Sequence, residues 1–182
     1  PQTKTPIKKV YEVPKSQVKL LGDDKFVQDI QRMLTYILSF HVDSLLYSFR
    51  EAAGLPTKGG DPMLGWDAPE SNLRGHTTGH YLSSIALAYE MTKDSRLEKQ
   101  ACELIHGLEA VQKKYTTISE AYVGYLSAYT IEQFEGLESG ETYPTVWAPY
   151  YTLHKIMAGL LDCYQVFNND TALSIVKQIG VW

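Results

Sequence analysis

Apolar side chains recur every three or four positions along most of the chain, which is the spacing of one face of an α-helix. The pattern predicts six helical stretches, over residues 26–38, 43–53, 77–91, 94–111, 149–166 and 170–179. Residues that start or stop helices lie between them. Asp23 or Asp24 can cap the first stretch, and Gly54 and Pro56 end the second.

The predicted helices differ in how their polar positions are arranged. Residues 77–91 and 149–166 are apolar on nearly all sides, which is typical of a buried helix, whereas residues 94–111 carry a polar side. Buried helices that alternate with amphipathic outer ones indicate an all-α fold of helical hairpins, of the (α/α)6-toroid type. In such a barrel the inner helices surround an axis, and loops at one end shape a pocket. Six helices make only about half of such a barrel.

The expected domain organisation is simple. Residues 1–24 are Lys-rich, contain Pro6 and Pro14, and read as an extended lead-in with at most a short strand. Residues 25–182 read as a partial α/α-barrel domain, the N-terminal portion of a larger catalytic domain. Two long connections, 57–76 and 116–147, interrupt the helices, and loops of this length in a compact domain are commonly functional. The acidic run at 132–141 is interpreted as a solvated face.

An internal repeat supports the hairpin interpretation. Residues 88–97 resemble residues 163–173, and the first segment begins at Ala88 and the second at Cys163, 75 positions later. Each unit has a Trp-containing loop, a histidine near the start of a buried helix, a short turn and an outer helix. His154 is interpreted as the second unit's counterpart of the histidines in the first.

Composition narrows the class of partner. The net charge of -4 argues against nucleic acid or an anionic membrane surface, and no stretch approaches the length of a membrane-spanning helix. Aromatic residues make up 12% of the chain, which suits carbohydrate or another neutral polar ligand, although aromatic-rich helix packing explains it equally well. Cys102 and Cys163 lie in apolar helical patterns, so buried free thiols are expected rather than a disulfide framework.

Two histidines open the third predicted helix. His76 and His80 are four residues apart and so share one helix face, the spacing that two-histidine metal sites use. No glutamate follows His76 as in a His-Glu-x-x-His motif, and no third ligand is set by spacing, so no metal is predicted in this chain. The alternatives are a pocket that binds hydroxyl groups and a packed structural pair, and the same choice applies to His154.

The loops contribute further candidates for binding a sugar. Trp66, Trp147, Tyr150 and Tyr151 lie just before inner helices and could form a stacking surface, or could simply pack the loop over the barrel end. Asp67 lies with Glu70 around Pro69. A carboxylate pair is what glycoside hydrolysis uses, but loop capping explains these residues as well.

Four short segments together resemble a known family. They are Gly-Trp-Asp at 65–67, Arg-Gly-His-Thr-Thr-Gly-His-Tyr-Leu-Ser at 74–83, Gly-Tyr-Leu at 124–126 and Tyr-Thr-Leu-His-Lys-Ile-Met-Ala-Gly-Leu at 151–160. In this order they resemble the N-terminal part of the β-L-arabinofuranosidases, glycoside hydrolase family 127 and its relative family 146. The resemblance runs from about Val18 to the end of the chain.

The resemblance implies a retaining hydrolase that acts on terminal L-arabinofuranose of plant glycans, built on an (α/α)6 barrel followed by β-rich domains. It also implies a zinc-bound cysteine nucleophile and a glutamate acid/base, with zinc held by further cysteines and a glutamate. We expect those catalytic groups beyond Trp182. The residues carried over to this chain are the substrate-binding histidines His154, His76 and His80.

Three interpretations follow for the chain. It is an N-terminal enzyme fragment that supplies part of the sugar pocket, lacks the zinc–cysteine site and is inactive alone. Alternatively, it is a stand-alone helical module that binds glycan or protein, or it is a helical scaffold. Half a toroid would expose inner helices through which a homo-oligomer could form. The resemblance favours a bacterial protein in a periplasmic or extracellular location.

Overall fold

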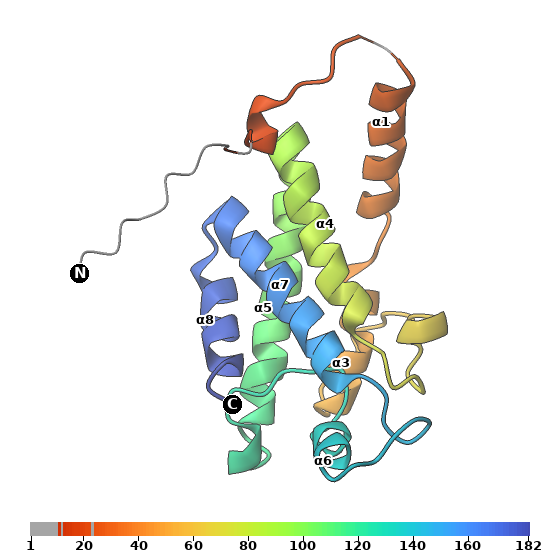
Figure 1. The fold of residues 1–182 in the computed structure, drawn as a ribbon, viewed down its shortest axis with the longest axis vertical. Helices are drawn as coiled ribbons and strands as arrows, with labels where there is room; N and C mark the ends of the chain where they lie inside the picture. Colours follow the sequence, from red (N-terminus) through yellow and green to blue (C-terminus); the bar gives the residue numbers. More distant parts are fainter. Residues whose placement is uncertain (1–10, 12, 23) are drawn as a thin grey trace, which may run out of the picture.

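The structure, a computed structural model, describes residues 11, 13–22 and 24–182. In this part of the chain every regular element is helical, as the apolar pattern predicts (Figure 1). The α-helices are α1 (Lys25–Leu38), α2 (Val42–Leu45), α3 (Tyr47–Ala52), α4 (His76–Thr92), α5 (Ser95–Tyr115), α6 (Glu132–Glu138), α7 (Pro149–Phe167) and α8 (Asp170–Ile179). Short 3-10 turns form at η1 (Lys15–Gln17), η2 (Gly65–Asp67) and η3 (Glu120–Tyr122).

Local signals set the start of the first helices. The Asp24 carboxylate accepts hydrogen bonds from the amides of Phe26 and Val27, so this aspartate caps α1. Asp23 and residues 1–10 and 12 lie outside the described residues, as do the expectations that fall on them. The described part of the lead-in contains the turn η1, and the division at residue 24 stays a prediction. The second stretch is two helices rather than one, since the helical pattern is interrupted at Leu46, which is fully buried.

Helices α4 and α7 lie side by side and run in the same direction through the middle of the molecule (Figure 1). Their backbones meet at two glycines. A Cβ on Gly79 would lie 2.3 Å from the Lys155 carbonyl oxygen, and one on Gly159 would lie 2.3 Å from the Gly79 carbonyl oxygen. Farther along, the Cys163 thiol lies 3.6 Å from the Leu82 carbonyl oxygen. The two helices therefore approach at a distance that only glycine permits.

The expectation that α4 is buried on all sides is wrong for one face. Leu82 and Ile85 are fully buried, but Leu87 is 42% exposed and Met91 is 45% exposed. The buried positions face α7 and α5, which pack against α4, and the exposed positions face away from both. We call this exposed side of α4, with the side of α7 next to it, the open face.

Helices α5 and α8 form the outer layer, as their polar sides predict. Helix α5 packs against α4 and α8, and α8 packs against α7. The buried Gln112 amide joins the layers by donating to the carbonyl oxygens of Gly124 and Ile175. Asp94 caps α5, and α8 begins at Asp170, as the pattern predicts, with Asn169 as its cap.

The internal repeat has a structural counterpart in the two hairpin turns. Helix α4 ends at Lys93 and α7 ends at Asn168, and both residues are left-handed with φ near 56° and 53°. A left-handed residue at this place ends a helix and turns the chain back. The α4–α5 and α7–α8 hairpins thus repeat one geometry at an offset of 75 residues.

The connection between α5 and α7 is ordered around buried aromatic rings. Tyr115, Tyr125 and Tyr129 are almost fully buried, and the Tyr125 ring packs against Phe134 and Trp182. The acidic run is solvated as predicted, but it forms helix α6, which the sequence reading missed. Burial of Phe134 holds α6 in place. None of the helices in the described part of the chain combines the length and apolarity needed to cross a membrane.

Candidate functional site

A buried carboxylate organises the start of α4. Asp67, 6% exposed, accepts a hydrogen bond of 2.6 Å from the amide of Gly75 and another from the Thr77 hydroxyl. Gly75 itself is left-handed with φ of 96°, and a Cβ there would meet Ala128 at 2.8 Å. A carboxylate beside the first turn of a helix satisfies free amides and interacts favourably with the helix dipole. Loop capping is therefore the role that the structure shows for Asp67.

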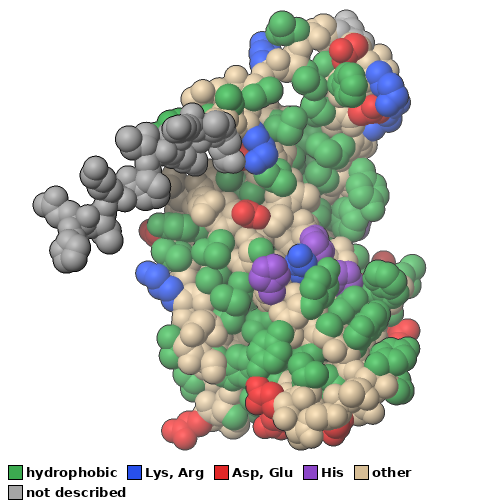
Figure 2. Space-filling model, viewed as in Figure 1, with side chains coloured by type: hydrophobic (Ala, Val, Ile, Leu, Met, Phe, Trp, Pro, Cys, Tyr) green, Lys and Arg blue, Asp and Glu red, His purple; other side chains and the backbone are tan. Residues whose placement is uncertain are grey.

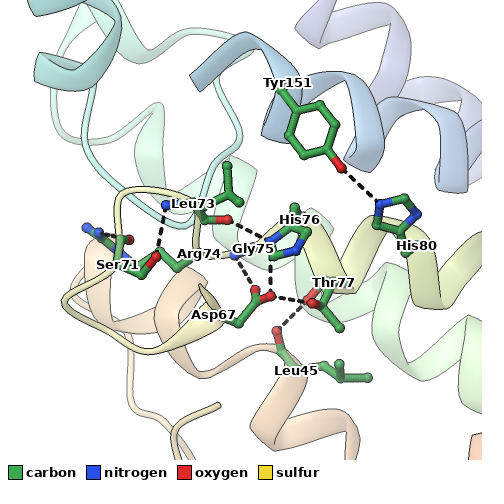
Figure 3. Close-up of polar contacts among 11 residues, drawn as sticks. Leu45, Asp67, Ser71, Leu73, Arg74, Gly75, His76, Thr77, His80 and Tyr151 are labelled. Carbon is green, nitrogen blue, oxygen red and sulfur yellow. Dashed lines mark hydrogen bonds and ion pairs between the residues drawn. The ribbon is translucent and has the colours of Figure 1, made fainter. Parts of the chain in front are cut away.

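The same carboxylate orients His76. The Nδ1 atom of His76 lies 3.0 Å from Asp67 Oδ2 and 2.8 Å from the Leu73 carbonyl oxygen (Figure 3). Both neighbours are acceptors, so Nδ1 carries the hydrogen. In the neutral form of the ring the lone pair is on Nε2, which is then the acceptor left for a ligand.

His76, His80 and Tyr151 form a cluster across the α4–α7 contact. His80 Nε2 lies 3.3 Å from the Tyr151 hydroxyl (Figure 3). The His76 and His80 rings lie edge to face with centroids 6.0 Å apart, and the His76 and Tyr151 centroids are 6.2 Å apart. Lys155 Nζ lies 5.1 Å from the Tyr151 ring centroid. We call these four residues the histidine cluster.

The surroundings of His80 favour its neutral form. Partial burial lowers the pKa of His80, and the charges of Lys155 and His76 lower it further, against a smaller opposing effect of Asp67. Desolvation and nearby positive charge both disfavour the protonated imidazole. A neutral His80 can both donate and accept a hydrogen bond, as binding a hydroxyl group requires.

The open face continues along the two helices beyond the cluster. The Ser83 hydroxyl donates a 2.6 Å hydrogen bond to the Asp162 carboxylate, which joins α4 to α7 one turn farther on. In the space-filling view, histidine side chains gather near the middle of one face around a basic side chain, with an acidic one nearby (Figure 2). This face therefore presents donors and acceptors on an otherwise apolar helix pair.

Arg74 fixes the loop that leads into the cluster. Its guanidinium donates from Nε to the Ala128 carbonyl oxygen and from Nη1 to the Ser71 carbonyl oxygen, at 2.9 and 2.7 Å. It also lies over the Tyr129 ring, and burial lowers its pKa. Arg74 thus joins the loop before α4 to the connection before α6, and its role here is positional.

The other predicted residues lie around the cluster rather than in it. His154 is exposed on α7, and in the described structure it takes no part in the cluster's hydrogen bonds or ring contacts. Trp66 is 68% exposed and packs against Trp147. Tyr150 points away from the histidine cluster, since its hydroxyl donates a hydrogen bond to Glu138 and its ring packs on Phe134. It lines a separate cavity of about 420 Å³.

The chain matches a known protein family over most of its length. Residues 17–182 match the family described as β-L-arabinofuranosidase, GH127 catalytic domain. The chain belongs to this GH127 family. Among curated proteins, none matches the chain. Membership in GH127 shows a glycoside-hydrolase-like function with carbohydrate as the class of substrate, and the all-helical structure agrees with the toroid-type fold.

The described residues of this GH127 chain do not fit the zinc that the resemblance implies. They include no group of three or more His, Cys, Asp or Glu side chains that could hold a metal ion. Both cysteines are free, and burial raises the pKa of the Cys163 thiol, whereas zinc binds thiolate. The expected place of the zinc ligands beyond Trp182 stays a prediction.

Lys155 was not among the predicted binding residues and Tyr151 was predicted only as part of a stacking surface, although the repeat could have placed both beside the histidines. The turns at Lys93 and Asn168 set an offset of 75 residues. At that offset Tyr151 corresponds to His76 and Lys155 corresponds to His80. His154 corresponds to Gly79, so its interpretation as the counterpart of the first unit's histidines is wrong. The two units contribute different side chains at equivalent positions.

Proposed function

We propose that the open face of α4 and α7 binds the terminal L-arabinofuranose of a plant glycan in a GH127 pocket. The observation that carries the proposal is the histidine cluster. It presents His76 Nε2, His80, the Tyr151 hydroxyl and the Lys155 ammonium on one face of the α4–α7 pair. Asp67 holds His76 in a single tautomer, so part of the site is organised before ligand arrives.

The chemical fit is to a neutral ligand with several hydroxyl groups. Each sugar hydroxyl donates one hydrogen bond and accepts others, and neutral imidazoles offer both functions. Lys155 supplies a charged donor, which strengthens a hydrogen bond to a sugar oxygen. His154, one turn along α7 from Tyr151, extends the same exposed side and is proposed as a peripheral contact.

We propose that the chain's own part in the reaction is to bind and orient the sugar. The nucleophile, the acid/base and the zinc implied by the resemblance are assigned to residues other than those described, because Cys102 and Cys163 sit in helix-packing positions. Zinc, when bound, would supply an activated thiolate. No step is assigned here to His76 or His80 beyond holding sugar hydroxyls.

The proposal is tested by titrating the chain with methyl β-L-arabinofuranoside in a calorimeter. We expect His80→Ala to weaken binding at least about tenfold, since a lost pair of hydrogen bonds is worth roughly 1–3 kcal/mol. The matched control is His106→Ala, because His106 is an exposed histidine on the outer helix α5. Unchanged affinity in His80→Ala would show that the histidine cluster is not the sugar site.

Two further parts of the proposal concern the setting of the protein. The exposed Leu87 and Met91 on α4 support self-association through the open face, and sedimentation of the chain at several concentrations tests this. A periplasmic or extracellular location rests on the family resemblance, and fractionation of the native source tests it.

A further inference from the structure

Three exposed aromatic rings stand together on the loops beside the histidine cluster. Trp66, Tyr143 and Trp147 are 68%, 71% and 42% exposed. Trp66 and Trp147 meet edge to face with centroids 6.2 Å apart, and Tyr143 meets Trp147 at 5.8 Å. Their exposure leaves part of each ring open to solvent. We call this group the aromatic rim.

Contacts within the two loops fix the positions of the rings in the aromatic rim. The Asn72 side-chain amide donates to the carbonyl oxygens of both Pro144 and Thr145 at 2.9 Å, which joins the two loops that carry the rings. Each tryptophan also has a buried neighbour in sequence. Asp67 follows Trp66 and is 6% exposed, and Val146 precedes Trp147 and is 2% exposed. The rings are therefore positioned before any ligand binds.

The rim adjoins the proposed sugar site at both loops. Asp67, next to Trp66, is the residue that orients His76. Trp147 lies in the loop four residues before Tyr151, which contacts His80. A ligand held by the histidine cluster and longer than one sugar would pass along this edge of the molecule.

The chemistry of the rim suits a second sugar. Large exposed aromatic rings clustered at one place mark a binding surface. Their faces pack against the C–H side of a sugar ring, while the indole N–H and phenol O–H bond to hydroxyls at its edge. Tyr36 on α1 and Phe26 on α1 are also exposed, but they are far along the chain from the cluster and lack this loop support.

We propose that the aromatic rim is a subsite for the sugar residue next to the terminal arabinofuranose, so that the preferred ligand is an oligosaccharide rather than a single sugar. The inference rests on the proposed function, because it takes the histidine cluster as the site of the terminal sugar. The inference adds Trp66, Tyr143 and Trp147 as the residues that make the protein prefer a longer oligosaccharide to a single sugar.

The test compares two probes, methyl β-L-arabinofuranoside and a β-linked L-arabinofuranosyl trisaccharide, by calorimetry and by tryptophan fluorescence. The expected result is that the trisaccharide binds the native chain at least about tenfold more tightly, which corresponds to roughly 1.4 kcal/mol. It should also shift the fluorescence, since Trp66 and Trp147 are the exposed tryptophans. Trp147→Ala and Trp66→Ala should remove most of this preference, and Trp147→Phe should keep part of it.

Controls separate the rim from the fold and from the histidine cluster. Phe26→Ala removes an exposed aromatic ring at a distant site and should leave the preference unchanged, and circular dichroism checks that every variant is folded. Equal affinity of the native chain for the two probes, including no measurable binding of either, overturns the inference. An unchanged preference for the trisaccharide in both tryptophan variants also overturns the inference. So does quenching of the tryptophan fluorescence by an apolar peptide but not by the trisaccharide. If His80→Ala keeps full affinity while the rim variants lose the preference, the proposed function fails and the rim subsite stands.

Discussion

Gly159 lies so close to Gly79 that a Cβ built on Gly159 would be 2.3 Å from the Gly79 carbonyl oxygen. This contact sets the spacing of α4 and α7, and through it the distance between His80 on one helix and Tyr151 on the other. Helix packing and site geometry therefore depend on the same pair of residues.

Replacing Gly159 with alanine should destabilise the protein. The added methyl group meets backbone on α4, which cannot rotate away, so the helices must separate at a cost of about 1–3 kcal/mol or more. Urea denaturation measures the free energy of unfolding. Gly180→Ala is the matched control, because a Cβ there would lie 3.5 Å from its nearest neighbour and its φ is −71°. Equal stability of the two variants would contradict the close-packing argument.

Asp67→Asn should destabilise the start of α4. The carboxylate accepts hydrogen bonds from Gly75 and Thr77 and faces the Nδ1–H of His76. In asparagine an NH₂ group replaces one of the two oxygens, so a donor would face the N–H or O–H donors around it. The expected loss is about 1–3 kcal/mol. Thermal unfolding measures the loss, and nitrogen-15 spectra of the imidazole report whether His76 keeps its tautomer. Glu70→Gln, at an exposed position in the same loop, should change neither.

Lys155→Gln should raise the pKa of His80 toward its ordinary value of 6.5 without restoring it. Partial burial is the larger cause of the depression and remains in the variant, while the repulsion from Lys155 is removed. A proton NMR titration of the His80 ring measures the change. Lys177→Gln, on the outer helix α8, should leave the titration unchanged, and an equal shift in both variants would rule out a local effect.

The depressed pKa also predicts the direction of a pH effect on stability. Because folded His80 prefers to be neutral, the unfolded chain binds its proton first as the pH falls through 6.5. The contribution of His80 is therefore present above that pH and is lost below it. In His80→Ala the decline of unfolding free energy between pH 7 and pH 5 should be smaller than in the native chain.

Cys163 should resist alkylation in the folded chain. Its side chain is fully buried, and burial raises the pKa of the thiol, so little thiolate is present at neutral pH. We expect iodoacetamide to modify the partly exposed Cys102 first, as read by peptide mass spectrometry, and both cysteines to react in denaturant. Rapid modification of Cys163 in the native chain would reopen it as a candidate zinc ligand or nucleophile.

Most helix boundaries could be predicted because the signals that set them are local. Asp24 and Asp94 cap helices through amides two or three residues away. Helix α6 was missed because its support is not local. Phe134 packs against Tyr125, in the same connection but outside α6, and against Trp182 at the far end of the described chain. The interruption at Leu46 carries no local signal such as Gly or Pro, so the sequence pattern did not predict it.

The candidate site also has features that local sequence predicts and features that only tertiary packing determines. Residue types and spacing alone were enough to single out His76, His80, Asp67 and Trp66, and the four motifs were enough to suggest the family that residues 17–182 match. Folding determined which of these residues meet. Asp67 reaches His76 because η2 packs under the first turn of α4, and Tyr151 reaches His80 because two glycines let the helices approach. The sequence carries the chemical groups and their local conformations, whereas distances between groups on separate elements arise only from packing.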